Sequence, residues 1–230
     1  MPIDFTSRNP GPELMDGSNV PQEDLFQNYR ELHVINKYLG GYRITLKGIQ
    51  QFNYDTDELS VLDVGSGGGD MLNEVSDWGR KKHVKLHLTG IDLSPAAISY
   101  SAKRFPGINW IQQDVFEHLK SGAKYDVIMS TLFMHHFSNE KIAELLKLMW
   151  QSCNVGIVVN DLHRYPLAYH SIRLLTKLFS GSYLVKHDAP MSVLRGFKKN
   201  ELTSVFEKAH VPIIVCKWEW AFRYLVVMKK

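Results

Sequence analysis

The stretch VLDVGSGGGD, residues 61–70, decides how the rest of this sequence is interpreted. The apolar run over residues 60–64 predicts a short strand, and the glycines at positions 65, 67, 68 and 69 predict a tight turn after it. The segment 70–81 predicts a helix, because four large apolar residues recur on one face: Met71, Leu72, Val75 and Trp78. Glycine lacks a Cβ atom and tolerates positive φ, so this turn lets a ligand approach the backbone closely. Such a turn is generic for nucleotide-like ligands.

The alternation of strands and helices continues along the chain. Apolar runs predict seven strands, over residues 60–64, 84–92, 108–112, 125–130, 155–160, 212–218 and 221–228. Helical periodicity predicts further helices over residues 95–104, 139–150, 166–179 and 200–209. This spacing favours a doubly wound α/β fold with a mostly parallel seven-stranded sheet and helices on both faces. The last two runs are so close that a hairpin must join them, so an antiparallel pair ends the sheet.

Ahead of the first strand the pattern is helical. Apolar residues return at three- and four-residue steps from Pro21 to Leu39, which predicts an amphipathic helix, and a weaker helical stretch covers Tyr42 to Phe52. We therefore expect an N-terminal helical cap segment over residues 1–55 and a ligand-binding domain over residues 56–230.

Composition narrows the class of protein. With 230 residues and 44% hydrophobic residues, the chain is long enough to bury the core of one globular domain. The net charge of +3 is small and the basic residues are scattered, which argues against a nucleic-acid partner. No apolar run is long enough to cross a membrane, and the first residues are unlike a secretory signal. The two cysteines lie far apart, which fits a reducing cytoplasm. The oligomeric state is left open.

Three carboxylates help to choose among NAD, FAD and S-adenosylmethionine as the ligand. Asp70 stands where a dinucleotide fingerprint has Gly or Ala, at the start of a helix, and a carboxylate there repels a pyrophosphate. Asp63 lies inside the first strand, where a charge is costly unless donors or a cationic ligand satisfy it. Asp92 ends the second strand, where it can accept hydrogen bonds from a ribose. S-adenosylmethionine carries an ammonium and a sulfonium, so it fits best.

Four motifs in order resemble those of the class I S-adenosylmethionine-dependent methyltransferases, which have a Rossmann-like fold. VLDVGSGGGD resembles the first motif, and the resemblance implies that Gly65, Ser66 and Gly67 hold the methionine portion while Asp63 acts on its amino group. GIDLSP, residues 90–95, resembles the second motif. It implies that Asp92 binds the ribose and that Leu93 packs on the adenine.

The third and fourth motifs complete this resemblance. QQDVF, residues 112–116, is similar to the third, which implies that Asp114 accepts from the adenine amino group and that Val115 covers the ring. YDVIMSTLFMHHF, residues 125–137, is similar to the fourth, which implies that Ser130 and Thr131 lie near the methyl group. The cofactor implied is S-adenosylmethionine.

The HHF element and NDLHR, residues 160–164, resemble enzymes that methylate quinone precursors, polyketides and other small natural products. The expected reaction is O- or C-methylation of a small aromatic or polyketide-like acceptor. Either His135 or His136 is a candidate base, because a phenol with a pKa near 10 is a poor nucleophile until it loses its proton. By the same analogy, residues 192–197 are expected to cap the acceptor.

Other polar residues keep two interpretations. Asp161, His163 and Arg164 follow the fifth strand, where they could hold the acceptor or cap the helix after Pro166. The histidine pairs show neither helical spacing nor a cysteine partner, so no metal is expected.

Tyr29 and Tyr38 could line the mouth of a pocket, or be part of an ordinary aromatic stripe in the core.

Two other functions stay open. An RNA methyltransferase needs a continuous basic face, and a catalytically silent module would bind the cofactor only to assemble a partner complex.

Overall fold

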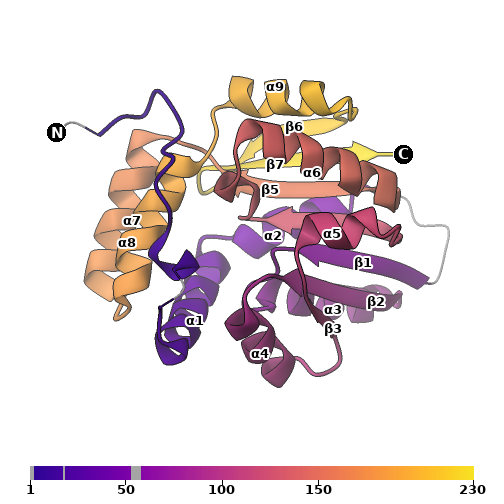
Figure 1. The fold of residues 1–230 in the computed structure, drawn as a ribbon, viewed down its shortest axis with the longest axis horizontal. Helices are drawn as coiled ribbons and strands as arrows, with labels where there is room; N and C mark the ends of the chain where they lie inside the picture. Colours follow the sequence, from indigo (N-terminus) through magenta and orange to yellow (C-terminus); the bar gives the residue numbers. More distant parts are fainter. Residues whose placement is uncertain (1–2, 18, 53–57) are drawn as a thin grey trace.

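The computed structural model describes residues 3–17, 19–52 and 58–230 (Figure 1). Its centre is a seven-stranded sheet with the order β3-β2-β1-β4-β5-β7-β6. The strands are β1 Glu58–Val64, β2 Lys85–Asp92, β3 Asn109–Gln112, β4 Tyr125–Thr131, β5 Cys153–Leu162, β6 Val215–Glu219 and β7 Arg223–Lys229. The first five strands run parallel, whereas β7 is antiparallel to both β5 and β6. The predicted mixed sheet with its antiparallel C-terminal pair is confirmed.

Helices cover both faces of the sheet. The helices are α1 Gln22–Tyr38, α2 Gly41–Ile49, α3 Asp70–Lys82, α4 Pro95–Arg104, α5 Val115–Lys120, α6 Asn139–Ser152, α7 Pro166–Phe179, α8 Tyr183–Arg195 and α9 Lys199–Ala209, with 3-10 turns η1 Leu14–Asp16 and η2 Met134–His136. Helices α5, α6 and α9 pack on one face, and α2 and α3 pack on the other. Strand β1 is buried between them, with Leu62 directed to the first group and Val61 to the second. Burial on both faces explains its unbroken apolar run.

The strand order fixes where a ligand can bind. From β1 the chain crosses to β2 and β3 on one side, whereas β4 and β5 lie on the other side. The crevice outside the carboxyl ends of β1 and β4 is therefore the switch point at which open α/β sheets bind their ligands. Figure 1 shows α1, α7 and α8 beyond this edge of the sheet.

The sequence pattern did not predict helix α8. It contains Pro190, and it is buried on more than one side, because Leu184, Asp188 and Val193 are all inaccessible. A helix surrounded in this way shows little amphipathic periodicity. The expected cap segment over residues 192–197 begins as the last turn of α8. Helix α5 was also missed, since it has only 6 residues.

The N-terminal part of the chain divides between two locations. Helix α1 packs on α4 and α8, whereas α2 joins the sheet core through Tyr42, Ile44 and Ile49. The expected domain boundary between residues 55 and 56 lies outside the described residues. Among the helices that the structure does describe, none is both long enough and apolar enough for a membrane span.

Candidate active site

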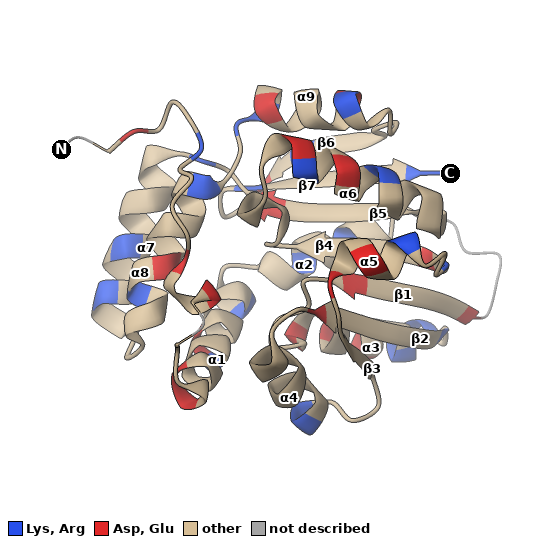
Figure 2. Cartoon of the chain, in the orientation of Figure 1, with Lys and Arg blue, Asp and Glu red and all other residues tan. Residues whose placement is uncertain are grey.

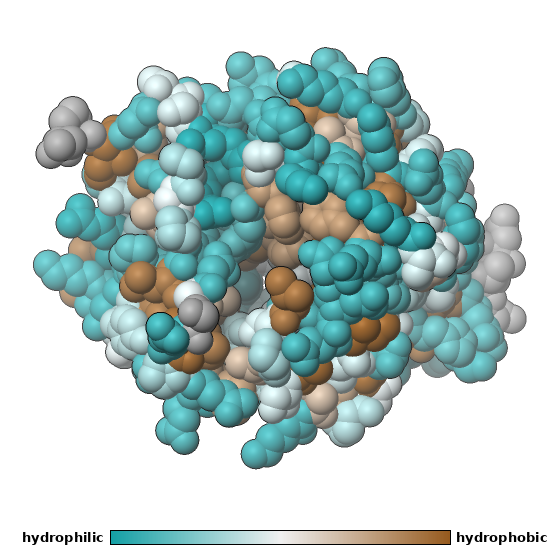
Figure 3. All heavy atoms as spheres, viewed as in Figure 1, coloured by the Kyte–Doolittle hydropathy of each residue, from teal (hydrophilic) through white to brown (hydrophobic). Residues whose placement is uncertain are grey.

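A pocket of about 1130 Å³ lies at the carboxyl ends of β1, β2 and β4. The glycine turn forms one wall, and η1 and α1 form the opposite wall. Figure 3 shows the surface hollowed near its centre, between the strand ends and these N-terminal elements. Tyr29 lines the pocket, whereas Tyr38 is 81% exposed and does not.

The turn after β1 has the conformation that its glycines allow. Gly65 has φ +69° and Gly67 has φ +51°. A Cβ atom on Gly65 would collide with the ring of Phe133, whereas one on Gly67 would meet open space. The N–H groups of Gly65 and Ser66 both donate to the carbonyl of Ile91, at 2.9 and 3.0 Å, and so tie the turn to β2. All three turn residues predicted to bind the cofactor line the pocket.

Asp63 is a buried carboxylate that lacks a complete set of donors. Its exposed fraction is 2%, and its Oδ1 atom has no hydrogen-bond partner among the described residues. Burial first, and then the negative charge of Asp92, raise the pKa of Asp63 well above its usual 3.8. A cationic ligand group at this position would supply the missing partner. The ammonium of S-adenosylmethionine has the required charge, so this carboxylate fits that cofactor.

Asp92 stands at the tip of β2 and holds the turn in place. Its Oδ2 accepts from the N–H of Gly67 at 2.8 Å, and its Oδ1 accepts from the N–H of Ser94 at 2.9 Å. Burial raises the pKa of Asp92, although these two backbone hydrogen bonds oppose the shift. The neighbouring Leu93 lines the pocket with 67% of its surface exposed, so its apolar side chain is free to cover a ligand ring.

The remaining predicted cofactor residues do not all reach the pocket. Asp114 and Val115 line it, but Oδ1 of Asp114 already caps α5 by accepting from the N–H groups of Phe116 and Glu117. Only Oδ2 of Asp114 is left for a ligand. Thr131 also lines the pocket, whereas Ser130 is completely buried and does not. Successive residues of a strand point to opposite faces, which accounts for this difference.

His135 sits in a buried network of charges. Its Nδ1 lies 2.7 Å from Oδ1 of Asp161, and its Nε2 lies 3.5 Å from Oε1 of Glu13. Burial alone would lower the pKa of His135, but Asp161 and Glu13 outweigh it and raise the pKa to about 9. The ring is thus protonated at neutral pH, with a carboxylate at each nitrogen. This geometry does not favour His135 as a base.

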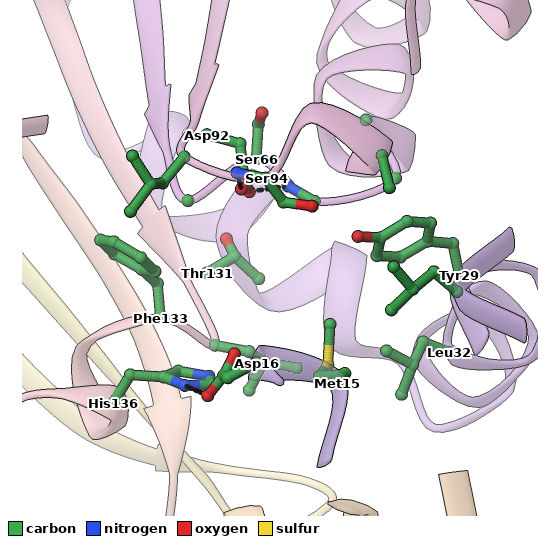
Figure 4. Close-up of a pocket in the computed structure, with 18 of the residues that line it drawn as sticks. Met15, Asp16, Tyr29, Leu32, Ser66, Asp92, Ser94, Thr131, Phe133 and His136 are labelled. Atoms are coloured by element: carbon green, nitrogen blue, oxygen red, sulfur yellow. Dashed lines mark hydrogen bonds and ion pairs between the residues drawn. The ribbon is translucent and has the colours of Figure 1, made fainter. Parts of the chain in front are cut away.

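His136 has a freer position at the pocket wall. Its Nδ1 lies 3.2 Å from Oδ2 of Asp16, and its Nε2 lies 3.9 Å from Oε2 of Glu13. Figure 4 shows His136 and Asp16 on the side of the pocket that lies across from Asp92 and Ser66. The pocket therefore has a cofactor-fitting end and a second, histidine-containing end.

The sequence analysis missed the acidic residues that the N-terminus brings to this second end. Glu13 is 4% exposed, and its Oε1 accepts from the Ser192 hydroxyl at 2.6 Å. Burial would raise the pKa of Glu13, but the hydrogen bond from His135 and the charges of both histidines lower it to about 2. No local pattern in the polar N-terminal sequence indicates this role, because it depends on contacts with residues more than 100 positions away.

Residues 3–17 form a strap that is anchored at several points. Arg8 donates to the carbonyls of His135 and Phe137, both at 2.8 Å. Asp188 of α8 accepts from the N–H groups of Leu14 and Met15, at 2.7 and 3.0 Å. The strap is therefore held over the histidine-containing end of the pocket.

Only one of the three polar residues after β5 belongs to the site. Asp161 contacts His135. Arg164 is buried away from the pocket, where it donates to the carbonyls of Gly196 and Phe5. His163 stacks on Tyr165, and neither residue lines the pocket. The structure therefore does not support the expectation that Arg164 and His163 hold the acceptor.

Comparison with known proteins agrees with the geometry of the pocket. Residues 61–156 match a family described as a methyltransferase domain. A search of curated protein sequences finds no significant match.

Solved structures with this fold include a TehB-like S-adenosylmethionine-dependent methyltransferase from Corynebacterium glutamicum, with a TM-score of 0.59 and 18% identity over 91% of this chain and 98% of the other. Human N-acetylserotonin methyltransferase, in complex with the cofactor, gives a TM-score of 0.60 and 18% identity over 91% of this chain and 56% of the other. A plantazolicin methyltransferase, in complex with S-adenosylhomocysteine, gives a TM-score of 0.59 and 24% identity over 82% of this chain and 69% of the other.

The domain match, the strand order and the unsatisfied carboxylate in a glycine-turn pocket point to one class. Residues 61–156 match a methyltransferase domain, and the chain has the fold of the class I S-adenosylmethionine-dependent methyltransferases.

Proposed function

We propose that this enzyme transfers a methyl group to an oxygen, or to a carbon beside a phenolic or enolic oxygen, of a small aromatic or polyketide-like acceptor. The observation that carries this proposal is the position of His136. It lies at the pocket wall beside Asp16 and across from the cofactor-fitting end (Figure 4). An imidazole there can accept the proton that a phenol or enol loses as it attacks.

At the cofactor end, the pocket positions already described support one role for each residue. Asp63 binds the ammonium group, while Gly65, Ser66 and Gly67 pass close to the methionine portion. Asp92 accepts from the ribose, Leu93 and Val115 cover the adenine, and Oδ2 of Asp114 accepts from its amino group. S-adenosylmethionine, when bound, supplies an electrophilic methyl group, so the protein's main task is to align the acceptor with it.

The size of the pocket supports a second bound molecule. Pockets that enclose one small ligand have volumes of roughly 300 to 1000 Å³. The pocket here, at about 1130 Å³, is larger than that range. Apolar side chains of Met15 and Leu32 lie on the wall opposite the glycine turn, which suits an aromatic acceptor (Figure 4). In this proposal residues 1–55 act as the cap, with η1 and α1 forming that wall.

A small acceptor is favoured over RNA. In Figure 2 the lysines and arginines are dispersed over several helices and do not form one continuous stripe. The plantazolicin and N-acetylserotonin methyltransferases are named for small molecules, and they share this fold. Both cysteines are free, which supports a reducing cytoplasm as the compartment.

A two-stage experiment tests the proposal. Calorimetry should first show binding of S-adenosylhomocysteine. A panel of phenols, enols and unmodified RNA is then incubated with the enzyme and radiolabelled cofactor. We expect label to enter a phenolic or enolic compound, and His136→Asn to abolish most of this transfer. Transfer to RNA alone, or cofactor binding with no transfer to any acceptor and no effect of His136→Asn in cells, would favour one of the two alternative functions.

A further inference from the structure

Glu13, His135 and His136 form a cluster whose potential ligand atoms converge. One carboxylate oxygen or ring nitrogen from each residue lies within 4.8 Å of the others. The two oxygens of Glu13 face different rings, with Oε1 3.5 Å from Nε2 of His135 and Oε2 3.9 Å from Nε2 of His136. Ligand atoms around one tetrahedral zinc ion are about 3.3 Å apart. The ligand atoms, which lie within 4.8 Å of one another, would therefore have to draw together by up to about 1.5 Å to share one cation.

Each imidazole in the cluster is also supported from behind. Nδ1 of His135 is 2.7 Å from Asp161, and Nδ1 of His136 is 3.2 Å from Asp16. A carboxylate that accepts the Nδ1 proton fixes the direction of the ring, so Nε2 can bind a cation that displaces its proton. Histidines that bind metals nearly always have such a partner on their other nitrogen. Both histidines here have one, and both Nε2 atoms face Glu13.

The charge around the cluster favours a cation. Four carboxylates converge at this end of the pocket: Glu13, Asp16, Asp161 and Asp188. Two guanidiniums, of Arg8 and Arg195, lie behind the histidines and donate to backbone carbonyls at residues 135–137. They hold the backbone of η2, and none of these hydrogen bonds uses a ring nitrogen.

We infer that Glu13, His135 and His136 bind a divalent transition-metal ion, zinc or a similar ion, at the acceptor end of the pocket. Two histidines and one carboxylate, with a position left open toward a cavity, are the ligand set of catalytic rather than structural metal sites. All three residues line the pocket. The open position therefore faces the space in which the acceptor would lie.

This inference rests on the proposed function, and it specifies the acceptor. A ligand for the open position must offer an oxygen that binds a metal, such as a phenolate, an enolate or one oxygen of a catechol or β-dicarbonyl. The ion would lower the pKa of that hydroxyl, whose proton passes to solvent. Because a metal uses the lone pair of His136, metal binding and direct proton acceptance by this residue exclude each other.

The test is a titration of metal-stripped enzyme with two ions. Binding of Co²⁺ is monitored by its visible absorption, and binding of Zn²⁺ is measured by equilibrium dialysis. We expect one ion per chain. Glu13→Gln and His136→Asn should each weaken binding at least tenfold, and Asp161→Asn should weaken it about 10- to 100-fold by removing support from a ligand. The matched control is His87→Asn, because His87 is exposed near the other end of β2 and should leave metal binding unchanged. Binding of S-adenosylhomocysteine shows that each variant is folded.

Two results would overturn the inference. One is a wild-type chain that binds no Co²⁺ or Zn²⁺, and the other is full affinity in both Glu13→Gln and His136→Asn. The proposed function is tested separately by measuring methyl transfer in excess chelator. If methyl transfer continues in excess chelator but still requires His136, then His136 is the base and the metal site is absent. If no phenolic or enolic compound is methylated while metal binding follows the variants as expected, the metal site stands and the proposed function fails.

Discussion

The two ends of the pocket are built in different ways. The cofactor end consists of turns that directly follow β1, β2 and β3, so each residue proposed to bind the cofactor lies within a few positions of a strand end. The acceptor end combines the strap, η2, the end of β5 and α8, which are far apart in the chain. A sequence motif describes the first kind of site well. It cannot describe the second, because those contacts exist only after the chain has folded.

The largest expected effect tests the acceptor end alone. His136→Asn should lower kcat by about 100- to 10,000-fold, the usual range for loss of a general base, whether His136 accepts the proton itself or holds a metal ion that activates the acceptor. The dissociation constant for S-adenosylhomocysteine should stay within about twofold, since His136 lies across the pocket from Asp92 (Figure 4). Steady-state kinetics and calorimetry on the same preparation provide the two measurements. A parallel loss of cofactor affinity would show that the two ends are not separate.

The second prediction tests the cofactor end. Asp63→Asn should weaken S-adenosylmethionine binding by about 10- to 100-fold, because a charge-assisted hydrogen bond contributes about 1.5 to 3 kcal/mol. The same change should stabilise the cofactor-free protein at neutral pH, because it removes a buried carboxylate with an unpaired oxygen. Calorimetry measures the first effect and thermal unfolding the second. Unchanged affinity would remove Asp63 from the cofactor site.

The pH dependence of this stabilisation has a definite sign. The pKa of Asp63 is raised in the folded state above its unfolded value of about 3.9, so folding disfavours the ionised form. The carboxylic acid form is fully present below that unfolded value, and its contribution to stability is lost as the pH rises through the folded pKa. The stability advantage of Asp63→Asn should therefore grow from pH 4 upward. An advantage that shrinks with rising pH would contradict this assignment.

The third prediction compares two glycines within the same turn. Gly65→Ala should destabilise the protein by about 2 to 3 kcal/mol, because it combines positive φ with a collision against Phe133. Gly67→Ala should destabilise the protein by only about 1 kcal/mol, since φ is positive at this position but the added Cβ would meet open space. Urea unfolding of both variants measures the difference. Equal destabilisation would mean that the collision is relieved by movement of the Phe133 ring.

The smallest expected effect concerns the strap. Asp188→Asn weakens the hydrogen bonds to the N–H groups of Leu14 and Met15, and should cost about 1 kcal/mol of stability. The KM for the acceptor should rise several-fold, whereas affinity for S-adenosylhomocysteine should hardly change. Kinetics with saturating cofactor provide the measurement. If cofactor affinity falls as much as acceptor affinity, the strap covers the whole pocket and not only its acceptor end.

The sequence was sufficient for the sheet and for the positions of the glycine turn and the strand-end carboxylates, because these follow from local patterns. The glycine turn and the carboxylates at the tips of β1 and β2 lie where their motifs predicted. Ser130 was the exception, since the strand pleat directs it away from the pocket. The roles of these residues in cofactor binding stay predictions.

Much of the acceptor end could not be predicted, for physical reasons that differ between elements. Helix α8 is buried on several sides and contains Pro190, so it lacks the amphipathic pattern of a surface helix. Glu13 lies in a polar segment, and its role comes from Ser192 and the two histidines. The expectation of no metal rested on spacing along the chain, which cannot show that the fold brings Glu13 close to both histidines.

The most direct test of how the pocket selects its ligand is calorimetric titration of the purified enzyme with S-adenosylhomocysteine and, separately, with NAD. Asp63 should bind the ammonium of the first ligand, whereas the pyrophosphate of the second would meet Asp70, a carboxylate that is already paired with Arg104 and His33. We expect binding of S-adenosylhomocysteine with one molecule per chain and no detectable heat from NAD. Binding of NAD without binding of S-adenosylhomocysteine would contradict the assignment of the pocket to a cationic nucleoside.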